Sequence, residues 1–320
     1  MKKPFSTNRM AWRLLNELIE NHVLYGVETE TLPQGTLIYD AGATARGGFR
    51  AGELVTEICL GGMGHARISL RKYGDLDLPS IFVYTDHPAV AALGCQFAGW
   101  RLSQEGYSAI GSGPARALAL KPRELFEEIQ YRDESDCAVM VIETDKSPPV
   151  ELIDRIARDC KVKPSRLAII LAPTASLVGA IQISGRIVET GLHKLRRLGL
   201  DPKKVQYACG CAPIPPVHPK LSKAMGRTND AILYGGVSYY AVESDDEEKL
   251  NKIVQKAPSK ASKVYGKPFF EIFKEADHDF YKIDSDLFAP ATVVVNNVRT
   301  GNTFAGGEIN VQMLKKSFEI

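Results

Sequence analysis

The sequence predicts an α/β protein of two domains. Its 320 residues are about twice the roughly 150 residues of a common domain. Hydrophobic residues make up 44% of the chain and charged residues 24%, which are the fractions of an ordinary folded globular protein. Strand-like runs alternate with helical patterns along most of the chain, and this alternation favours an α/β fold. We place the domains at residues 1–165 and 166–320, with the alternative that the C-terminal strands return to the first domain.

The first part of the chain predicts an amphipathic helix followed by strands. Apolar residues recur at helical spacing from Ala11 to Val23, after the capping candidates Ser6, Thr7 and Asn8. β-rich runs that end at glycine or proline predict three strands. These strands are Thr36–Tyr39, Glu57–Leu60 and Ser80–Thr85. The small residues of Ala89–Trp100 predict a second helix.

The second part of the chain predicts a buried strand and a long helix. Leu167–Ala172 is uniformly apolar, which is typical of a strand covered on both faces. After a break at Pro173, one helix is expected over residues 175–198, ended by Gly199. The acidic run Asp245–Glu248 predicts a helix start, where the helix dipole favours negative charge. Two terminal strands are expected, at Asp279–Asp284 and Ala291–Val295.

Charge and hydropathy exclude several classes of protein. Lys and Arg number 40 against 38 Asp and Glu, a net charge of +2 with no basic block, so nucleic acid is not an expected partner. No apolar stretch approaches the roughly 20 residues that span a bilayer. Arg9, Arg13 and Glu17 interrupt the region that would have to be apolar in an export signal. The expected location is therefore the cytoplasm.

Familiar nucleotide and metal motifs are incomplete in this sequence. Gly42–Gly47 has the spacing of a phosphate-binding P-loop but lacks the lysine and hydroxyl that should follow it. Gly111–Arg116 begins like a dinucleotide fingerprint but has Arg116 in place of the third glycine. The six cysteines form no CxxC pair, so we expect free thiols and no metal site.

Three polar segments that contain glycine are candidate ligand loops: residues 111–116, 224–230 and 265–268. Backbone amides beside glycine, together with Arg116 and Arg227, would suit a ligand that carries a phosphate. Ordinary turn and cap chemistry explains the same residues slightly better, and both interpretations stay open here.

One polar stripe runs along the predicted long helix, at spacings of three, seven and eleven residues from its first member. It consists of Arg186, Glu189, His193 and Arg197. On a surface, Arg186 and Glu189 would form an ion pair worth about 0.2–0.5 kcal/mol. In a pocket, burial would raise the pKa of the glutamate and the guanidinium would lower it. Such a carboxylate is ionised at neutral pH yet basic enough to take a proton from water.

Several ordered segments of the chain are together similar to one family. They are Asp86–Ala89, Gln96–Trp100, Gly111–Leu118, Ala172–Ser176, Arg186–Thr190, Ala224–Ile232, Tyr265–Phe269 and Phe280–Asp284. By these segments the sequence resembles the methenyltetrahydromethanopterin cyclohydrolases of methanogenic archaea and methylotrophic bacteria. The resemblance runs from about Asp40 to the C-terminus, and agreement in so many segments makes chance an implausible explanation.

The resemblance implies a two-domain α/β subunit with a large pocket between the domains, assembled as a homotrimer. It also implies an enzyme of one-carbon metabolism, in methanogenesis or formaldehyde oxidation, that uses no metal and no cofactor. The reaction would be the reversible hydrolysis of 5,10-methenyltetrahydromethanopterin to 5-formyltetrahydromethanopterin. The alternatives are a noncatalytic pterin-binding protein and a hydrolase that acts on a related pterin or folate.

The same resemblance assigns the reactive residues to the C-terminal domain. The family's catalytic glutamate corresponds to Glu189, and its partnering arginine corresponds to Arg186. Further substrate contacts are expected at Gln96, Ser112, Arg116, Gln182, Arg227, Thr228 and Asn229. The sequence departs from the family at Phe97, where some members carry Lys or Tyr, so a polar contribution from that position is not expected.

Overall fold

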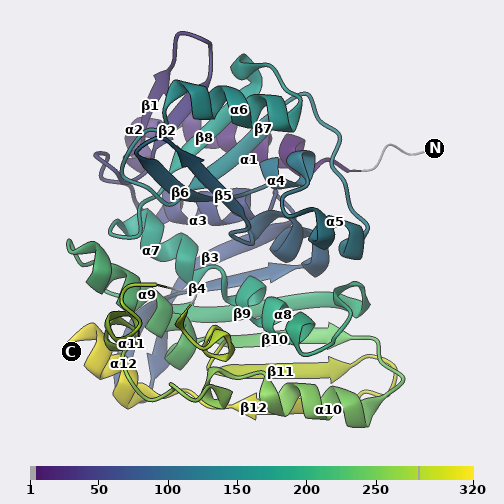
Figure 1. Cartoon of the computed structure of the whole chain (residues 1–320). Coiled ribbons are helices and arrows are strands. Elements are labelled where there is room, and N and C mark those ends of the chain that lie inside the picture. Colours follow the sequence, from purple (N-terminus) through teal and green to yellow (C-terminus); the bar gives the residue numbers. More distant parts are fainter. Residues whose placement is uncertain (1–4, 280–281) are drawn as a thin grey trace. The chain divides into compact units, whose positions relative to one another are not determined.

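The contacts of the chain group into two compact units, each built on one six-stranded sheet (Figure 1). The computed structural model describes residues 5–279 and 282–320. Unit 1 contains the chain up to His65 together with Val90–Gln182, and unit 2 contains Ala66–Ala89 and Ile183–Ile320. The prediction of two α/β domains is confirmed. The expected boundary after residue 165 falls inside unit 1, because the strand that follows it belongs to the sheet of that unit.

The sheet of unit 1 is mixed, with a parallel centre and antiparallel edges. Its strands, in spatial order, are β1 (Glu28–Thr31), β2 (Leu37–Asp40), β8 (Leu167–Leu171), β7 (Ala138–Ile142), β6 (Tyr107–Ser112) and β5 (Trp100–Gln104). β2, β8 and β7 pair in parallel. Every residue of β7 and β8 is buried, as expected for strands covered on both faces. The strands predicted at 36–39 and 167–172 are therefore confirmed.

Helices of unit 1 pack on both faces of its sheet, and alternate residues of β7 point to each side. Val139 and Val141 join one core cluster with α1 (Thr7–Glu20) and α3 (Phe49–Cys59). Met140 joins another cluster with α6 (Val150–Cys160). The remaining helical segments are α2 (His22–Tyr25), η1 (Ala89–Gln96), α4 (Ala115–Ala119), α5 (Arg123–Ile129), η2 (Pro164–Arg166) and α7 (Leu177–Ser184).

The first helix begins where the sequence predicts it, and one predicted strand is wrong. Ser6 caps α1 by accepting a hydrogen bond from the Arg9 amide at 3.2 Å. Residues 57–60, predicted as a strand, instead contain the end of α3. Leu54, Val55 and Ile58 of that helix are fully buried at helical spacing. The predicted strand covered only four residues, too few to show the helical spacing of these buried side chains.

A buried aspartate fixes the start of α1 to the rest of unit 1. The Oδ2 atom of Asp133 accepts hydrogen bonds from the Thr7 hydroxyl at 2.9 Å and from the Asn8 amide at 2.8 Å. It also accepts one from the Asn8 side-chain amide at 2.7 Å. The Asn8 side-chain oxygen in turn accepts from the backbone N–H of Val139, at 3.0 Å, in β7. This network connects the N-terminus of α1, the loop before β7 and β7 itself.

The sheet of unit 2 is mostly antiparallel. Its strands, in spatial order, are β12 (Thr303–Gly307), β11 (Thr292–Asn297), β10 (Val237–Val242), β9 (Val205–Pro213), β4 (Leu76–Thr85) and β3 (Gly64–Tyr73). β10 and β11 pair in parallel, whereas β10 pairs with β9, and β9 with β4, in antiparallel register. The strands predicted at 80–85 and 291–295 are confirmed.

The helices of unit 2 include α8 (Ile187–Arg197), α9 (Leu221–Gly235), α10 (Glu247–Lys256), α11 (Phe269–Glu275) and α12 (Val311–Phe318), with short turns η3 (Pro202–Lys204), η4 (Ser259–Ala261) and η6 (Ser285–Leu287). The predicted start of α10 is confirmed, because Asp246 caps it by accepting from the Lys249 amide at 2.9 Å. Residue 279 and residues 282–284 are not in a strand as predicted, and residues 280–281 lie outside the described part. Asp284 instead caps η6.

A second buried aspartate connects three helices of unit 2. Asp230 of α9 accepts a hydrogen bond from the Phe269 amide, 2.9 Å from Oδ1, at the start of α11. Its Oδ2 atom accepts another from the Ser317 hydroxyl of α12 at 2.6 Å. Burial raises the pKa of Asp230 to about 7, although these hydrogen bonds act in the opposite direction.

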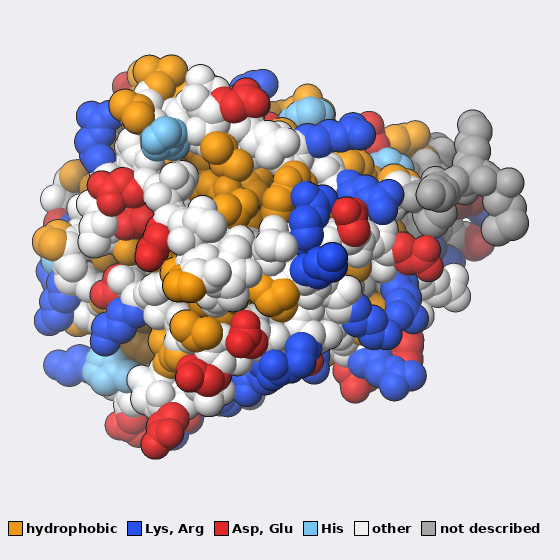
Figure 2. Space-filling model, turned by 90° about the horizontal axis from the view of Figure 1, so that it is seen from above, with side chains coloured by type: hydrophobic (Ala, Val, Ile, Leu, Met, Phe, Trp, Pro, Cys, Tyr) orange, Lys and Arg blue, Asp and Glu red, His pale blue; other side chains and the backbone are white. Residues whose placement is uncertain are grey.

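Charged side chains of both signs are mixed on the surface of the protein. On the face seen in Figure 2, basic side chains lie among acidic ones and do not form one continuous basic surface, as the near-neutral net charge predicts. Within residues 5–279 and 282–320, no helix has both the length and the apolar character that a membrane crossing requires.

Asp133→Ala should destabilise the protein by about 3 kcal/mol or more, because three buried donors lose their acceptor. The matched control is Asp136→Ala, since the Asp136 side chain is 65% exposed and its pairs with Arg9 and Arg166 should contribute less than about 1 kcal/mol. Urea unfolding of both variants measures the difference. Equal losses would show that the Asp133 network does not anchor α1.

Asp230→Asn should change how stability depends on pH. The folded protein keeps a proton on this carboxyl above its ordinary pKa of 3.8, so the stability that the proton provides is lost as the pH rises towards about 7. An asparagine does not titrate, so the variant should gain stability relative to the parent between about pH 5 and about pH 8. Urea unfolding at both pH values measures this. A constant difference would contradict the raised pKa.

Candidate functional site

The helix predicted over residues 175–198 is interrupted close to Arg186 and Glu189. Two helices occupy the region: α7 ends at Ser184, and α8 begins at Ile187. Arg186 is the N-cap of α8, with φ −79° and ψ 7°, outside the regular helix. Gly185 stands at the break, and glycine is the least favourable residue inside a helix apart from proline. The single helix predicted over residues 175–198 is therefore wrong.

Glu189 lies in the first turn of α8 and is buried together with Arg186. The two residues are 7% and 6% exposed, respectively. Their interpretation as a surface ion pair is therefore wrong. The first turn of a helix also presents backbone N–H groups without helical partners and a positive dipole end, both of which favour a carboxylate. The sequence thus places an acid and a guanidinium, three residues apart, at a buried helix start.

Arg197, the last residue of the predicted polar stripe, has structural partners in unit 2. Arg197 donates to the Ser285 carbonyl at 2.8 Å and to its hydroxyl at 2.6 Å. Burial, followed by the charges of Arg196 and Arg197, lowers the pKa of His193 to about 4. His193 is therefore neutral at neutral pH. Neighbouring Lys194, 1% exposed, pairs with Asp286 at 2.6 Å. These contacts connect the later turns of α8 to η6.

The sequence patterns do not point to Tyr240, whose hydroxyl donates to the Val188 carbonyl in α8 at 2.8 Å. One feature of the sequence could have indicated this contact. Gly191 lies inside a predicted helix, and a glycine at such a position usually allows another group to pack closely against the helix. In the structure the Tyr240 hydroxyl occupies the space beside Gly191 that a Cβ would fill.

The predicted binding residues of unit 1 are buried polar side chains. Gln96 ends η1, and both Gln96 and Gln182 are fully buried. The Gln182 side-chain amide donates to Glu143 at 3.3 Å. Ser112 lies at the end of β6, and its hydroxyl donates to the Val141 carbonyl at 3.4 Å. Polar groups inside a protein require such partners, so burial alone does not separate a binding role from a structural one.

Arg116 has a structural environment that differs from the predicted phosphate contact. Its Nη1 atom donates to the carbonyls of Leu93, Gly94 and Cys95 at 3.1, 3.1 and 3.3 Å, and its Nε atom donates to the Lys121 carbonyl at 2.8 Å. The residue is fully buried. The carbonyls at the end of η1 lack helical partners and attract a cation. These contacts favour a structural role for Arg116, which joins α4 to η1.

Phe97 and Phe126 complete this environment. The Arg116 guanidinium carbon lies 5.2 Å from the ring centroid of Phe97 and 5.6 Å from that of Phe126, within the range of a cation–π contact. Phe97 thus supports a buried cation at the position where the sequence departs from the family pattern. The helix predicted over residues 89–100 is a π-helix, η1, that ends at Gln96, and Trp100 already belongs to β5.

The remaining predicted residues are consecutive on α9 in unit 2. Arg227 donates to Glu319 at 2.8 Å and to the Pro216 carbonyl at 3.2 Å. The side chains of Thr228 and Asn229 both donate to the Met225 carbonyl, at 3.1 and 2.9 Å. The structure therefore brings Arg227, Thr228 and Asn229 together on one helix, with bonds to their own unit.

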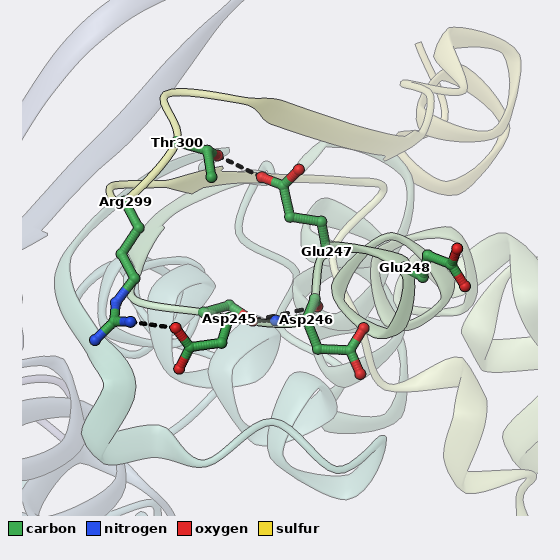
Figure 3. Close-up of a pocket in the computed structure, with 7 residues that line it drawn as sticks. Asp245, Asp246, Glu247, Glu248, Arg299 and Thr300 are labelled. Carbon is green, nitrogen blue, oxygen red and sulfur yellow. Dashed lines mark hydrogen bonds and ion pairs between the residues drawn. The ribbon is translucent and has the colours of Figure 1, made fainter.

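A cavity of about 490 Å³ lies at the start of α10 but contains none of the predicted site residues. Its lining consists of Ser244, Asp245, Asp246, Glu247, Glu248, Arg299 and Thr300 (Figure 3). Arg299 points towards Asp245 and pairs with it, Thr300 bonds Glu247, and Glu248 points away from both. The acids therefore cap the helix and bind Arg299, which accounts for their gathering without a ligand.

Cysteines and potential metal ligands are dispersed. All six cysteines are free thiols, and burial raises the pKa of Cys95 to about 12. Among the residues that the structure describes, no three His, Cys, Asp or Glu side chains gather as metal ligands.

Comparison with known proteins identifies the family. A family model described as Cyclohydrolase (MCH) matches residues 6–318. The methenyltetrahydromethanopterin cyclohydrolase of Methanothermobacter marburgensis is 48% identical over 318 residues, which cover 98% of this chain and 99% of that protein. The protein of the same name from Methanocaldococcus jannaschii is 46% identical over 315 residues, 98% of each chain. That from Methanobrevibacter smithii is 46% identical over 321 residues, 98% of this chain and 99% of its own.

The matched region extends through both units and includes every predicted site residue. The similarity is thus not confined to one motif or one half of the molecule. The chain belongs to the Cyclohydrolase (MCH) family.

Proposed function

We propose that this protein hydrolyses 5,10-methenyltetrahydromethanopterin reversibly to 5-formyltetrahydromethanopterin, with Glu189 as the general base. The substrate class follows from the names of the similar proteins, which cover this chain almost completely. The observation that supports the role of Glu189 is its burial in the first turn of α8, directly after the capping residue Arg186.

The chemistry requires little beyond a positioned water and a base. The bridging carbon of the cationic amidinium is already electrophilic, so the water oxygen can attack it once a proton is removed. Glu189 accepts that proton, and the new carbon–oxygen bond forms. Cleavage of the bond between this carbon and N10 then leaves the formyl group on N5. The proton held by Glu189 passes to N10, and the hydroxyl proton of the intermediate is released to solvent as the carbon–oxygen double bond forms. The reverse reaction uses the same groups in the opposite order.

Arg186 is the orienting partner in this proposal. A guanidinium close to a carboxylate favours the ionised form, and its planar donors can hold the carboxylate in one orientation. The negative charge of Glu189 also favours a cationic substrate. Positioning of the water and the bridging carbon supplies the rest of the rate enhancement. None of these steps uses a metal ion or a nucleotide, so we propose catalysis without a cofactor.

Other expectations accompany this proposal as predictions. Substrate contacts by Gln96, Ser112, Gln182 and the three consecutive residues of α9 are among them. So are the homotrimer and the cytoplasmic location.

Glu189→Gln should lower kcat by about 10² to 10⁴, because the amide cannot accept the proton of water. Loss of the methenyl absorbance of 5,10-methenyltetrahydromethanopterin measures turnover, and thermal unfolding checks that the fold is kept. Glu57→Gln is the matched control, since Glu57 is a helical glutamate only 4% exposed in unit 1. Near-normal turnover in Glu189→Gln would refute its role, and a parent protein that binds the pterin without turnover would indicate a noncatalytic pterin-binding protein.

Arg186→Lys should lower kcat about tenfold or more while the Michaelis constant changes less, because lysine keeps the charge but loses the planar pair of donors. Arg196→Lys is the control, since Arg196 lies in the last turn of α8, away from Glu189. Steady-state kinetics of both variants give the comparison. A kcat unchanged by Arg186→Lys would show that the arginine does not orient the base.

A further inference from the structure

Tyr240 reaches from the centre of the unit 2 sheet to the first turn of α8. It lies on β10, opposite Ala208 of β9 and Val295 of β11, so strands on both sides fix its backbone. The side chain is fully buried. Its hydroxyl donates to the carbonyl of Val188 at 2.8 Å, and Val188 immediately precedes Glu189. This bond joins the rigid sheet to the residue beside the proposed base.

The close approach of Tyr240 to α8 depends on Gly191. A Cβ atom added at Gly191 would lie 2.2 Å from the Tyr240 hydroxyl oxygen and 2.8 Å from the Ser238 hydroxyl oxygen. Real Cβ atoms do not approach other atoms so closely, so any larger residue would push the strand and the helix apart. Glycine is unfavourable inside a helix, and here it leaves room for the tyrosine.

The hydroxyl keeps its proton under all ordinary conditions. Burial raises the pKa of Tyr240 far above its usual range, and the negative charge of Glu189 acts in the same direction. The hydroxyl therefore keeps the proton with which it donates to the Val188 carbonyl.

We infer that Tyr240 is a positioning residue that holds the first turn of α8, and with it the Glu189 carboxylate, at the place required for proton transfer. This inference rests on the proposed role of Glu189. Tyr240 acts through the helix backbone and takes no proton itself. Misplacement of a catalytic group by as little as about 1 Å can lower the rate about 10²-fold. Loss of the one buried hydrogen bond that holds this turn should therefore lower kcat.

Tyr240→Phe keeps the ring and removes only the hydroxyl. We expect kcat for 5,10-methenyltetrahydromethanopterin to fall about tenfold or more, while the Michaelis constant changes less than about twofold. The control is Tyr73→Phe, because Tyr73 is also a buried tyrosine of the same sheet and its hydroxyl bonds Ser80 at 3.0 Å. Both variants should lose a similar amount of thermal stability, but Tyr73→Phe should keep the parental kcat. A parental kcat in Tyr240→Phe would overturn the inference.

Gly191→Ala tests the same contact from the helix side. Alone, it should lower kcat and thermal stability, because the new methyl group meets the Tyr240 hydroxyl. Combined with Tyr240→Phe, the loss in kcat should be smaller than the product of the two single losses, since the closest neighbouring atom has been removed. Losses that simply multiply would show that the two residues do not act on one contact.

The double variant Glu189→Gln/Tyr240→Phe separates this inference from the proposed function. In the Glu189→Gln background, Tyr240→Phe should cause no further loss of the residual rate, because the group it positions is already inactive. A full additional loss would overturn the inference while the role of Glu189 stands. Normal turnover in Glu189→Gln alone would overturn the proposed function together with the inference built on it.

Discussion

The burial of two opposite charges at one helix start is the constraint on which the site depends. Charged side chains are costly to remove from water unless other groups compensate them. The start of α8 offers a carboxylate the free amides of a first turn and the positive end of a helix dipole, and it has a guanidinium three residues away in sequence. The break after α7 provides this arrangement, because a continuous helix would use those amides for its own hydrogen bonds. Glu189 and Arg186 are therefore placed by the interruption of the helix rather than by its continuation.

Buried polar residues have a similar function elsewhere in both units. Asp133 fixes the start of α1, Asp230 connects α9 to α11 and α12, and Arg116 holds the end of η1. Each aspartate accepts from one backbone N–H at a helix start and from side-chain donors, and Arg116 donates to several backbone carbonyls. Apolar side chains form the core around each sheet, but their packing does not fix the positions of the helix ends. These polar contacts supply that information, and Tyr240 provides a comparable one for α8.

Much of the fold could be predicted from the sequence, because the buried strands are uniformly apolar and short. β8 is an example, with five consecutive apolar residues bounded by a turn. The break between α7 and α8 was not predicted, since buried apolar residues lie on both sides of it and Gly185 was the single local signal within it. The role of Arg116 was not predicted either, because the carbonyls that it binds belong to the π-helix η1, which is not adjacent to Arg116 in the sequence. For Glu189, spacing alone indicated a surface pair, and only resemblance to a family pointed to catalysis.

The discontinuous units have a consequence for how the chain is made. β3 and β4 leave the ribosome before most of unit 1, yet β4 pairs with β9, which is synthesised only after unit 1 is complete. During synthesis, the edge of β4 that later pairs with β9 therefore has no partner strand. An unpaired strand edge can pair wrongly or exchange with another chain. Contacts so distant in sequence also slow folding. Neither unit can be obtained as one contiguous fragment, so dissection of this protein would require a circularly permuted or two-chain form.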